Sequence, residues 1–528
     1  MITTADIVVA GAGHNSLITA AYLAASGREV VVLDTRAIPG GGAASEELLS
    51  PGYVLDSCST GHTLIQTNPV IADDELGLLG QYGLEYLMPD PFAHVAFPDG
   101  RHLTTWLDLE RTCEEIARFS KADAEAYRRL LAEYDEVKHL FGAANFTPIG
   151  FGPSLDERLR SHPKGNVWLR RRALSAWDVV RREFESRHVQ AFLVWQAYQT
   201  LVPVDAPGSG ALAYSVVFGR QRRSWTLPRG GSGQLTDALV ACIEDHGGTV
   251  LCGRRVSSLV LEDGRCAGVE TEAGERFLAR EAVVSTIHVK HLLDMAPRSA
   301  WPEDFVYGVE TFDIGVPCSA TFLATTAAPE FATPDGPRSA VSAGLAGWPE
   351  DVVAFNRDLR DGRWIEDPQW VLVATPTLAD PSRAPDGRHT VKFLAPQSHG
   401  FAERKEAMAD RLMRRVQELC PGFVDDVVLE RLVRAPEDIE ANNEHMIHGT
   451  FHGGDRTLPQ SGALRPAPGW AQHRMPIPGL YQTGGTTHPG GSITGGPGRN
   501  AAIVLLADLG TTIEEVVSSA GRTRAGSH

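Results

Sequence analysis

The segment from residue 7 to residue 34 constrains the fold of this 528-residue chain more than any other feature. Four apolar residues from Ile7 to Ala10 predict a short buried strand, and a glycine turn follows it at Gly11 and Gly13. The apolar residues after this turn recur with helical spacing, and Val30 to Leu33 predict a second strand. A strand, a helix and a strand in this order are the unit of a parallel sheet covered by helices, so we predict an α/β fold.

The glycine turn has the spacing of a dinucleotide-binding site. Gly11 permits the tight turn, Gly13 lets the backbone approach a pyrophosphate, and the N-terminus of the new helix presents N–H groups to that phosphate. Asp34 follows Gly13 at the offset of about 20 residues at which an acidic side chain accepts hydrogen bonds from the adenosine ribose. Ser16 replaces the third glycine of the motif and is small enough to be tolerated. The alternative, a βαβ unit without a ligand, is disfavoured because so many offsets agree.

Three further glycine runs indicate a cofactor longer than NAD. The first run comprises Gly40 to Ala44 and follows Arg36, the second precedes a predicted helix from Gln234 to Asp245, and the third extends from Gly484 to Asn500 before a predicted helix from Ala501 to Leu509. A glycine turn at the N-terminus of a helix offers N–H groups to an extended ligand. FAD fits several distant contacts better than NAD. The chain has no second complete βαβ motif for NAD(P)H, so we expect electrons to leave to an external acceptor such as dioxygen or a quinone.

The composition excludes several other classes of protein. The 66 acidic and 49 basic side chains give a formal charge of −17, whereas binding to nucleic acid depends largely on an excess of Lys and Arg. The 7 cysteines include no C-x-x-C pair, which fits neither a secreted disulfide framework nor a zinc module, so we expect a cytoplasmic protein. No stretch reaches the ~18 apolar residues of a membrane span. We therefore expect a soluble protein, or one that at most lies on a membrane surface.

Motifs along nearly the whole chain resemble those of the phytoene-desaturase-like FAD oxidoreductases, a group that contains the bacterial carotenoid desaturases and retinol saturase. The matching stretches include Ala10 to Asn15, Gly230 to Leu235, Ala435 to Glu440, Gly449 to Gly453 and His488 to Ala502. The resemblance implies an α/β fold with a Rossmann-type, glutathione-reductase-like FAD-binding domain and an interleaved α+β substrate domain. It also implies an FAD-dependent dehydrogenase or desaturase that removes hydride from a C–H bond of a small, largely apolar substrate.

The resemblance assigns the FAD contacts to individual residues. The pyrophosphate would lie at the first glycine turn, the adenosine ribose at Asp34, the adenine at the backbone of Val256, the ribityl chain at Gly41 to Ala43, and the isoalloxazine at the loop from Gly490 to Asn500. Relative to the family pattern, Ser16 replaces a glycine and Asp34 replaces the commoner Glu. The complete predicted set is Gly11, Gly13, Asn15, Ser16, Asp34, Arg36, Gly41, Gly42, Ala43, Val256, Gly485, Gly490, Gly491, Ser492, Gly498 and Asn500.

Two histidines are the candidates for acid–base chemistry. A flavin accepts hydride without a protein nucleophile, so the protein has to orient the substrate, exclude water and supply at most one acid or base. His452 and His488 lie in family-like motifs, and imidazole titrates near neutral pH. The alternative is that each only hydrogen-bonds the loop backbone. The spacing of His445, His448 and His452 would allow a metal site on a helix, but the Gly449 turn interrupts such a helix, so we predict no metal.

The order of the motifs predicts two intertwined domains. Residues 1–75, 228–295 and 476–528 would form the FAD domain. Residues 76–227, mainly helical, and residues 296–475 would form the substrate domain.

Local patterns predict several elements within these segments. Ser120 is typical of an N-cap and predicts a helix that begins after it. Alternating runs between Ser257 and Thr286 predict a small antiparallel meander, which we expect to cover the parallel sheet beside the adenine. The β-rich runs from Trp370 to Ala374 and from Thr390 to Leu394 predict a sheet in the substrate domain.

A stripe of four large apolar residues predicts one amphipathic helix, formed by Leu174, Trp177, Val180 and Phe184. Two interpretations are open. The stripe either rests on a membrane surface, from which an apolar substrate would enter, or packs into the protein core. We favour the core, because packed surface helices commonly carry such stripes.

Two other functions compete with dehydrogenation. A similar FAD scaffold also supports oxidation of amines. Because function belongs to the site and not to the scaffold, the chain could also be a flavin-binding interaction protein that has lost turnover.

Overall fold

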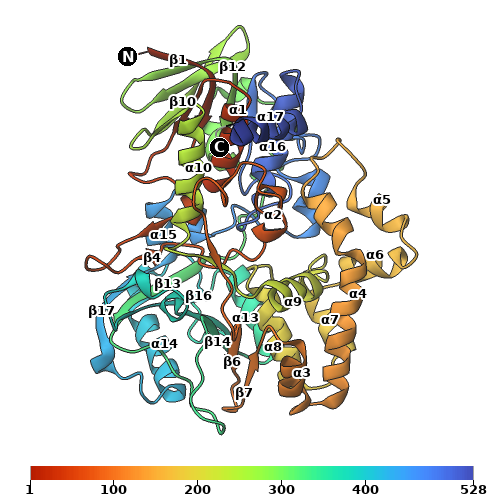
Figure 1. The fold of residues 1–528 in the computed structure, drawn as a ribbon, viewed down its shortest axis with the longest axis vertical. Coiled ribbons are helices and arrows are strands. Elements are labelled where there is room, and N and C mark those ends of the chain that lie inside the picture. Colours follow the sequence, from red (N-terminus) through yellow and green to blue (C-terminus); the bar gives the residue numbers. More distant parts are fainter. Residues whose placement is uncertain (1, 527–528) are drawn as a thin grey trace.

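The computed structural model describes residues 2–526, which form two large sheets with helices around them (Figure 1). The sheet at the top of Figure 1 has seven strands in the order β10-β11-β12-β1-β2-β9, with β18 beside β12. Its strands are β1 (Ile2–Ala10), β2 (Val30–Leu33), β9 (Thr249–Leu251), β10 (Val256–Glu262), β11 (Arg265–Thr271), β12 (Arg276–Ser285) and β18 (Leu480–Gln482).

The predicted βαβ unit is confirmed. Helix α1 (His14–Ala25) connects β1 to β2, and the two strands pair in parallel from Ile7 with Val30 to Ala10 with Leu33. Both faces of β1 are buried, because alternate residues of the strand belong to apolar clusters on opposite sides of the sheet. Such burial explains the continuous apolar run in the sequence.

Four helices cover one face of this sheet: α1, α10 (Gly233–Asp245), α16 (Gly496–Asp508) and α17 (Ile513–Gly526). The helix predicted after the second glycine run is confirmed as α10. The predicted start of the last apolar helix, Ala501, is wrong, because α16 already begins at Gly496. The end of the third glycine run is therefore the first turn of a helix.

The predicted antiparallel meander is confirmed as β10, β11 and β12, but its expected position is wrong. Strand β12 pairs in parallel with β1 from Ile2 with Arg276 to Ala10 with Ser285. The meander therefore extends the parallel sheet at its edge and does not cover it.

The sheet at the bottom of Figure 1 also has seven strands, in the order β17-β13-β16-β15-β14-β6-β7. Both β-rich runs of the sequence are confirmed as strands of this sheet. Alternate residues face opposite sides, so that Leu372 and Leu394 face one apolar cluster while Val373 and Phe393 face another. The strands are β6 (Ala93–Ala96), β7 (His102–Thr105), β13 (Cys318–Thr325), β14 (Ser342–Ala346), β15 (Trp370–Ala374), β16 (His389–Pro396) and β17 (Val428–Arg434).

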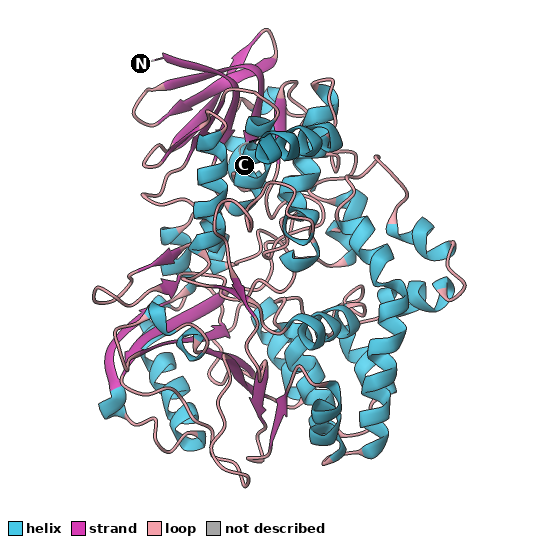
Figure 2. Ribbon diagram, in the orientation of Figure 1, coloured by secondary structure: helices cyan, strands magenta, loops and turns pink. Residues whose placement is uncertain are grey.

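A group of helices packs against one face of the lower sheet, and α14 (Lys405–Leu419) packs against the other (Figure 2). The predicted cap is confirmed, because Oγ of Ser120 accepts a hydrogen bond of 3.1 Å from the N–H of Asp123. The helices of the group are α3 (Leu109–Ala117), α4 (Lys121–Asn145), α5 (Leu155–Arg160), α6 (Gly165–Ala173), α7 (Ala176–Glu183), α8 (Arg187–Tyr198), α9 (Leu212–Arg223) and α13 (Pro349–Arg360).

The prediction that the apolar stripe is a single helix is wrong. Leu174 follows the end of α6, Ser175 caps the new helix α7, and Phe184 lies just beyond its end. The stripe nevertheless packs inward, since Val180 and Phe184 are buried in the core of the helical group and Trp177 contacts that core. This packing favours the core interpretation over a membrane surface.

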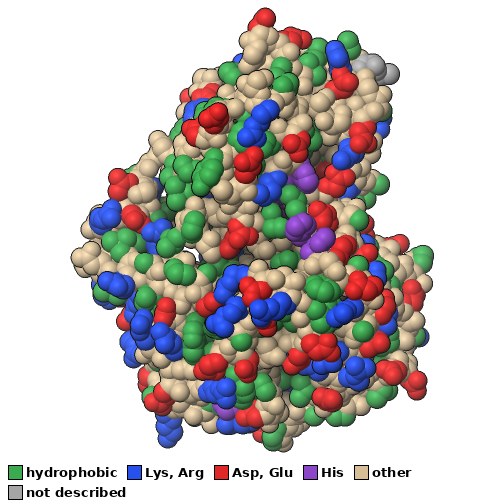
Figure 3. Space-filling model, turned by 180° about the vertical axis from the view of Figure 1, so that it is seen from behind, with side chains coloured by type: hydrophobic (Ala, Val, Ile, Leu, Met, Phe, Trp, Pro, Cys, Tyr) green, Lys and Arg blue, Asp and Glu red, His purple; other side chains and the backbone are tan. Residues whose placement is uncertain are grey.

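The remaining elements are short and connect these layers. They are α2 (Pro69–Ala72), α11 (Val289–Asp294), α12 (Glu303–Glu310), α15 (Pro436–Asn442), β3 (Ser45–Glu46), β4 (Leu55–Asp56), β5 (Tyr86–Leu87) and β8 (Leu227–Pro228). Within residues 2–526, no helix combines the length and the apolar character that crossing a bilayer requires. On the face shown in Figure 3, basic and acidic side chains are interspersed. The division into two domains of five segments remains our proposal.

Candidate active site

A cavity of about 660 Å³ lies between the two sheets, at the carboxyl ends of β1 and β2. Ligands of doubly wound sheets bind at this edge, and the volume is typical of small-molecule sites. The predicted residues that line the cavity are Gly11, Gly13, Asn15, Asp34, Arg36, Gly41, Gly42, Val256, His452, Gly485, Gly491 and Ser492. The predicted residues that do not line it are Ser16, Ala43, His488, Gly490, Gly498 and Asn500.

The first glycine turn leaves open space in front of the N-terminus of α1. Gly11 has φ +102°, and a Cβ there would lie 2.4 Å from the methyl group of Thr286, so only glycine fits. At Gly13 a Cβ would meet only Oγ of Ser16, at 4.0 Å, which leaves that space free for a ligand. The first hydrogen bond of α1 runs from Leu17 N–H to Gly13 O, and no acidic residue lies in the first turn. The preceding N–H groups can therefore bind phosphate.

Ser16 supports this turn from behind. Its side chain is buried and its hydroxyl contacts two loop carbonyls, Gly11 O at 2.6 Å and Gly13 O at 2.9 Å. One hydroxyl proton serves both carbonyls, so the contacts are alternative or shared. The serine that departs from the glycine motif therefore stabilises the loop and has no direct contact with the cavity.

Asp34 marks one end of the cavity. Its Oδ2 accepts a hydrogen bond from Ala12 N–H at 2.7 Å, and its Oδ1 accepts one from Arg36 N–H at 2.8 Å. Burial raises the pKa of the Asp34 carboxyl, although these two N–H groups act in the opposite direction. Arg254 N–H donates to the Asp34 carbonyl, which places Val256 nearby at the start of β10. The guanidinium of Arg36 lines the cavity and is paired with a glutamate of β3.

The first and third of the further glycine runs, Gly40 to Ala44 and Gly484 to Asn500, bring separate segments of backbone together. A Cβ on Gly41 would lie 3.2 Å from Cα of Gly13, so the two glycine turns are in contact. A Cβ on Gly485 or Gly491 would lie 2.5 or 2.0 Å from the carbonyl oxygen of His452. These glycines are needed for close approach of the chain to itself at the cavity. Ala43, in the first of these runs, is buried in the core.

Two residues of the last motif hold helices together and do not reach the cavity. A Cβ on Gly498 would lie 2.3 Å from the carbonyl oxygen of Asn15, because α16 packs closely on α1 there. Asn500 donates to the carbonyl of Asn145 at the end of α4. Gly490 packs against the side chain of Arg456. The sequence motif is thus largely a packing motif.

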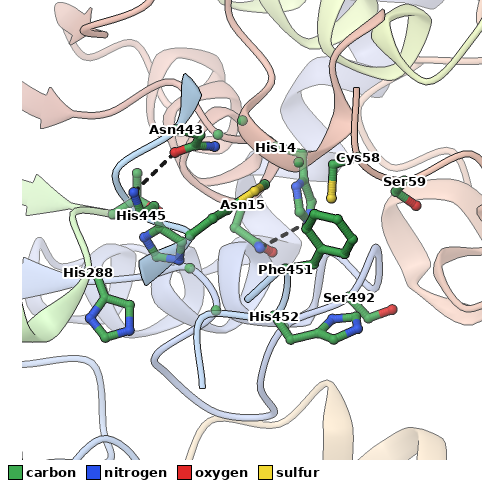
Figure 4. A pocket seen from close by; sticks show the side chains of 18 of the residues that line it. His14, Asn15, Cys58, Ser59, His288, Asn443, His445, Phe451, His452 and Ser492 are labelled. Carbon is green, nitrogen blue, oxygen red and sulfur yellow. Dashed lines mark hydrogen bonds between the residues drawn. The ribbon is translucent and has the colours of Figure 1, made fainter. Parts of the chain in front are cut away.

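The structure separates the two candidate histidines. His452 lines the cavity beside Ser492 (Figure 4), and its Nδ1 has no hydrogen-bond partner among the described residues. Burial lowers the pKa of His452 to about 3, and two nearby arginines add to this effect, so the imidazole is neutral at pH 7. His488 lies outside the cavity lining, where its Nε2 is 3.0 Å from the carbonyl of Ala144. For His488 the geometry favours the backbone-contact alternative.

The other histidines do not form a cluster with His452. His445 lines the cavity, whereas His448 is exposed and stacks on His399 with ring centres 4.4 Å apart. His14 also lines the cavity, and its Nε2 is 3.0 Å from Nδ2 of Asn15. Sequence reasoning missed His14 as a lining residue, although it immediately follows the glycine turn.

Lys392 is a further lining residue that sequence reasoning missed. Its Nζ contacts the carbonyls of Asp56 at 3.2 Å and Cys58 at 2.6 Å and the hydroxyl of Thr60 at 3.0 Å. A lone lysine inside an apolar strand was the available signal. Cys58 also lines the cavity, but burial raises the pKa of its thiol to about 12, so it is not a reactive thiolate.

The lower part of the cavity is walled by large apolar side chains. It lies among the segment 199–201 that follows α8, the helix α9 and the strands β15 and β16. The apolar residues that line it are Leu201, Val216, Trp225, Trp370, Leu372 and Leu394. The acidic residues of the cavity lining are Asp34, Glu272, Asp294, Glu440 and Glu444, so none of them lies on these four elements.

The fold and the cavity together define an FAD-dependent oxidoreductase of the Rossmann type. The chain belongs to the family of flavin-containing amine oxidoreductases, whose sequence model matches residues 17–498. Among curated proteins it is 28% identical to the mouse protein "Pyridine nucleotide-disulfide oxidoreductase domain-containing protein 2", over 96% of this chain and 94% of that protein. It is 27% identical to a limonene dehydrogenase chain of Castellaniella defragrans, over 96% of this chain and 95% of that one. It is 27% identical to the lycopene-forming phytoene desaturase of Pseudescherichia vulneris, over 95% of this chain and 99% of that protein.

A solved structure supports the fold assignment. Cyclohexylamine oxidase from Brevibacterium oxydans superimposes with a TM-score of 0.56 and 16% sequence identity, over 96% of this chain and 99% of that chain. The predicted α/β fold, the resemblance to phytoene-desaturase-like oxidoreductases and the FAD cofactor are thus confirmed.

The residues of the cavity fit FAD. The open space at Gly13, the unbonded N–H groups of α1 and the contact between Gly13 and Gly41 form a cradle for an extended dinucleotide. When bound, FAD accepts hydride from the substrate, which is the dehydrogenation that this family performs. The chain's own residues then have to bind the substrate, exclude water and hold one proton.

Proposed function

We propose that this chain dehydrogenates a C–H bond of a largely apolar organic substrate and passes the electrons to an external acceptor such as dioxygen or a quinone. The observation that carries the proposal is the apolar wall formed by Trp225, Trp370, Leu372 and Leu394 in the part of the cavity away from Asp34. Such a wall binds hydrocarbon surface by removing it from water.

The charges near this wall disfavour amine oxidation. Most amines are cationic at pH 7, and a bound cation would meet Lys392 and Arg220 without an acidic side chain on the same elements. Relatives whose names refer to limonene and phytoene act on hydrocarbons, which supports the apolar class.

His452 is our proposed acid–base residue, because it alone of the two candidates lines the cavity. In its neutral form the imidazole has a free nitrogen lone pair, which is our proposed acceptor for the proton that the substrate loses. The phosphate and ribose contacts predicted at Gly11, Gly13, Asn15 and Asp34 remain part of the proposal.

The reducing cytoplasm remains the proposed location, supported by seven cysteines that are all free thiols. We expect neither a nucleic acid nor a membrane surface as a partner.

The test is an absorption spectrum of the purified protein, followed by anaerobic titration with phytoene, limonene and cyclohexylamine. Bleaching of the flavin by a hydrocarbon is the expected result. Bleaching by the amine alone would indicate an amine oxidase, and binding of all three without bleaching would indicate a flavin-binding interaction protein. The Gly13→Val variant, which should lack flavin, is the matched control.

A further inference from the structure

One charged side chain in the apolar part of the cavity has no role in hydride transfer or FAD binding. Arg220 lies on α9, one turn after Val216, and both residues line the cavity. Only 7% of Arg220 is exposed. Its guanidinium lies 5.5 Å from the ring of Trp225, and its Nη2 donates a hydrogen bond to Oε1 of Gln199.

Arg220 lacks the carboxylate partner that two other buried arginines, Arg383 and Arg499, have. Arg383 is paired with Asp56 at 2.8 Å, and Arg499 is paired with Glu75 at 2.7 Å. Among the described residues no carboxylate pairs with Arg220, and its Nη1 has no hydrogen bond. A buried cation without a counter-charge is costly, because the protein does not replace the hydration that the charge has lost.

Arg220 is also the cation in this part of the cavity that retains donor capacity. The ammonium group of Lys392 has three acceptors, the carbonyls of Asp56 and Cys58 and the hydroxyl of Thr60. The guanidinium of Arg220 has five N–H donors and one neutral acceptor, the amide of Gln199. An anionic group of a ligand would complete both its charge and its hydrogen bonds.

We propose that Arg220 binds a carboxylate at the polar end of the substrate and thereby positions the apolar remainder against Trp225 and Trp370. The proposal rests on the dehydrogenase function and narrows the substrate class to apolar carboxylic acids. Arginine binds carboxylate through two parallel hydrogen bonds, which fixes orientation as well as position. Arg220 is then a residue that determines substrate specificity, and the reacting C–H bond lies in the apolar part of the same molecule.

The test compares two apolar acids, geranic acid and retinoic acid, with their methyl esters. Binding to the FAD-loaded protein is measured by isothermal titration calorimetry and by the fluorescence of the cavity tryptophans, neither of which requires turnover. We expect at least one acid to bind the wild type more tightly than its ester by about ten- to a hundredfold. Arg220→Gln should abolish this preference, and Arg220→Lys should retain part of it.

The matched control is Arg222→Gln, which removes an exposed arginine of the same helix and should leave the preference unchanged. Arg220→Met serves as a second variant, and thermal unfolding of each variant verifies that it folds. The proposal is overturned if neither acid binds the wild type more tightly than its ester, or if folded Arg220→Gln and Arg220→Met keep the wild-type preference. Failure of the dehydrogenase function has a different signature, namely acid-selective binding without bleaching of the flavin by any apolar compound.

Discussion

Replacement of Gly13 by valine should remove FAD without harming the apoprotein. Gly13 has φ −71° and ψ 156°, a conformation that any residue adopts, and a Cβ there would approach only Oγ of Ser16, at 4.0 Å. The valine side chain would therefore lie in open space, in front of the N-terminus of α1. We propose that in the holoprotein the pyrophosphate approaches the backbone in this space.

The size of the effect follows from the hydrogen bonds at this turn. A hydrogen bond between a backbone N–H and a charged phosphate contributes about 1.5–3 kcal/mol. Displacement of the phosphate by the branched side chain would remove at least two such bonds, or about 3–6 kcal/mol in total. This corresponds to a loss of about two to four powers of ten in FAD affinity.

The assay has two parts. FAD affinity is measured by quenching of flavin fluorescence on titration of the apoprotein, and the free energy of unfolding of the apoprotein is measured by urea denaturation. Gly13→Val should weaken FAD binding while the unfolding curve stays close to the wild type. Gly11→Ala is the contrasting control, because a Cβ there lies 2.4 Å from the methyl of Thr286 at φ +102°, and we expect the apoprotein to lose about 2–5 kcal/mol.

Two results would refute this reasoning. If Gly13→Val purified with one FAD per chain, the pyrophosphate would not bind at this turn. If its apoprotein lost as much stability as Gly11→Ala, the space in front of α1 would not be open. Either result would also remove the physical basis for the cradle formed by Gly13 and Gly41.

Three further predictions concern stability and catalysis. Ser16→Ala should lower the free energy of unfolding by about 1–2 kcal/mol, because the loop carbonyls lose their hydroxyl donor, and Ser16→Gly should lower it by about 1 kcal/mol more. A higher free energy of unfolding for Ser16→Gly in urea denaturation would contradict this prediction. In stopped-flow reduction of the flavin, His452→Gln should slow the reaction by about a hundredfold or more, whereas His488→Gln should leave the rate unchanged; equal effects would contradict the assignment. Burial lowers the pKa of His473 to about 4, so the unfolded chain binds a proton that the folded chain does not as pH falls below about 6.5. Stability should decline over this range, and His473→Gln should reduce the slope by about 1.4 kcal/mol per pH unit; an unchanged slope in urea denaturation at several pH values would be the contrary result.

The elements that the sequence predicts well are those whose signal is local. The apolar run of β1, the glycine turn after it and the spacing to Asp34 all lie within about thirty residues, and the structure places them at the cavity as predicted. A buried parallel strand has to be apolar on both faces, so its pattern hardly depends on which segments become its neighbours. Strand β15 is antiparallel, but it too is buried on both faces, which explains its accurate limits.

The elements that the sequence misplaces depend on packing between distant segments. The sequence around Gly498 predicts a glycine loop that binds a ligand. In the structure, a glycine is required there because α16 packs closely on α1 at Asn15. The motif around His488 predicts a histidine beside the flavin, whereas in the structure its ring contacts the carbonyl of Ala144 near the end of α4. A glycine or histidine in a loop motif has the same appearance whether it contacts a cofactor or another helix, so only the tertiary fold separates the two.

The hydrogen-bond partners of the two cations in the apolar part of the cavity, Lys392 and Arg220, also depend on the tertiary fold. In the sequence, Lys392 is a lysine in a strand and Arg220 is one of several arginines near the end of a helix. Folding gives Lys392 three oxygen acceptors from the segment Asp56 to Thr60, whereas it leaves Arg220 with the amide of Gln199 alone. Two cations on neighbouring elements thus differ in what they can offer a ligand: Lys392 holds the segment beside the cofactor cradle in place, and Arg220 is the group free to select the polar end of a substrate. Selectivity for a substrate then depends on which cation already has its hydrogen-bond acceptors within the protein, and not on how many cations line the cavity.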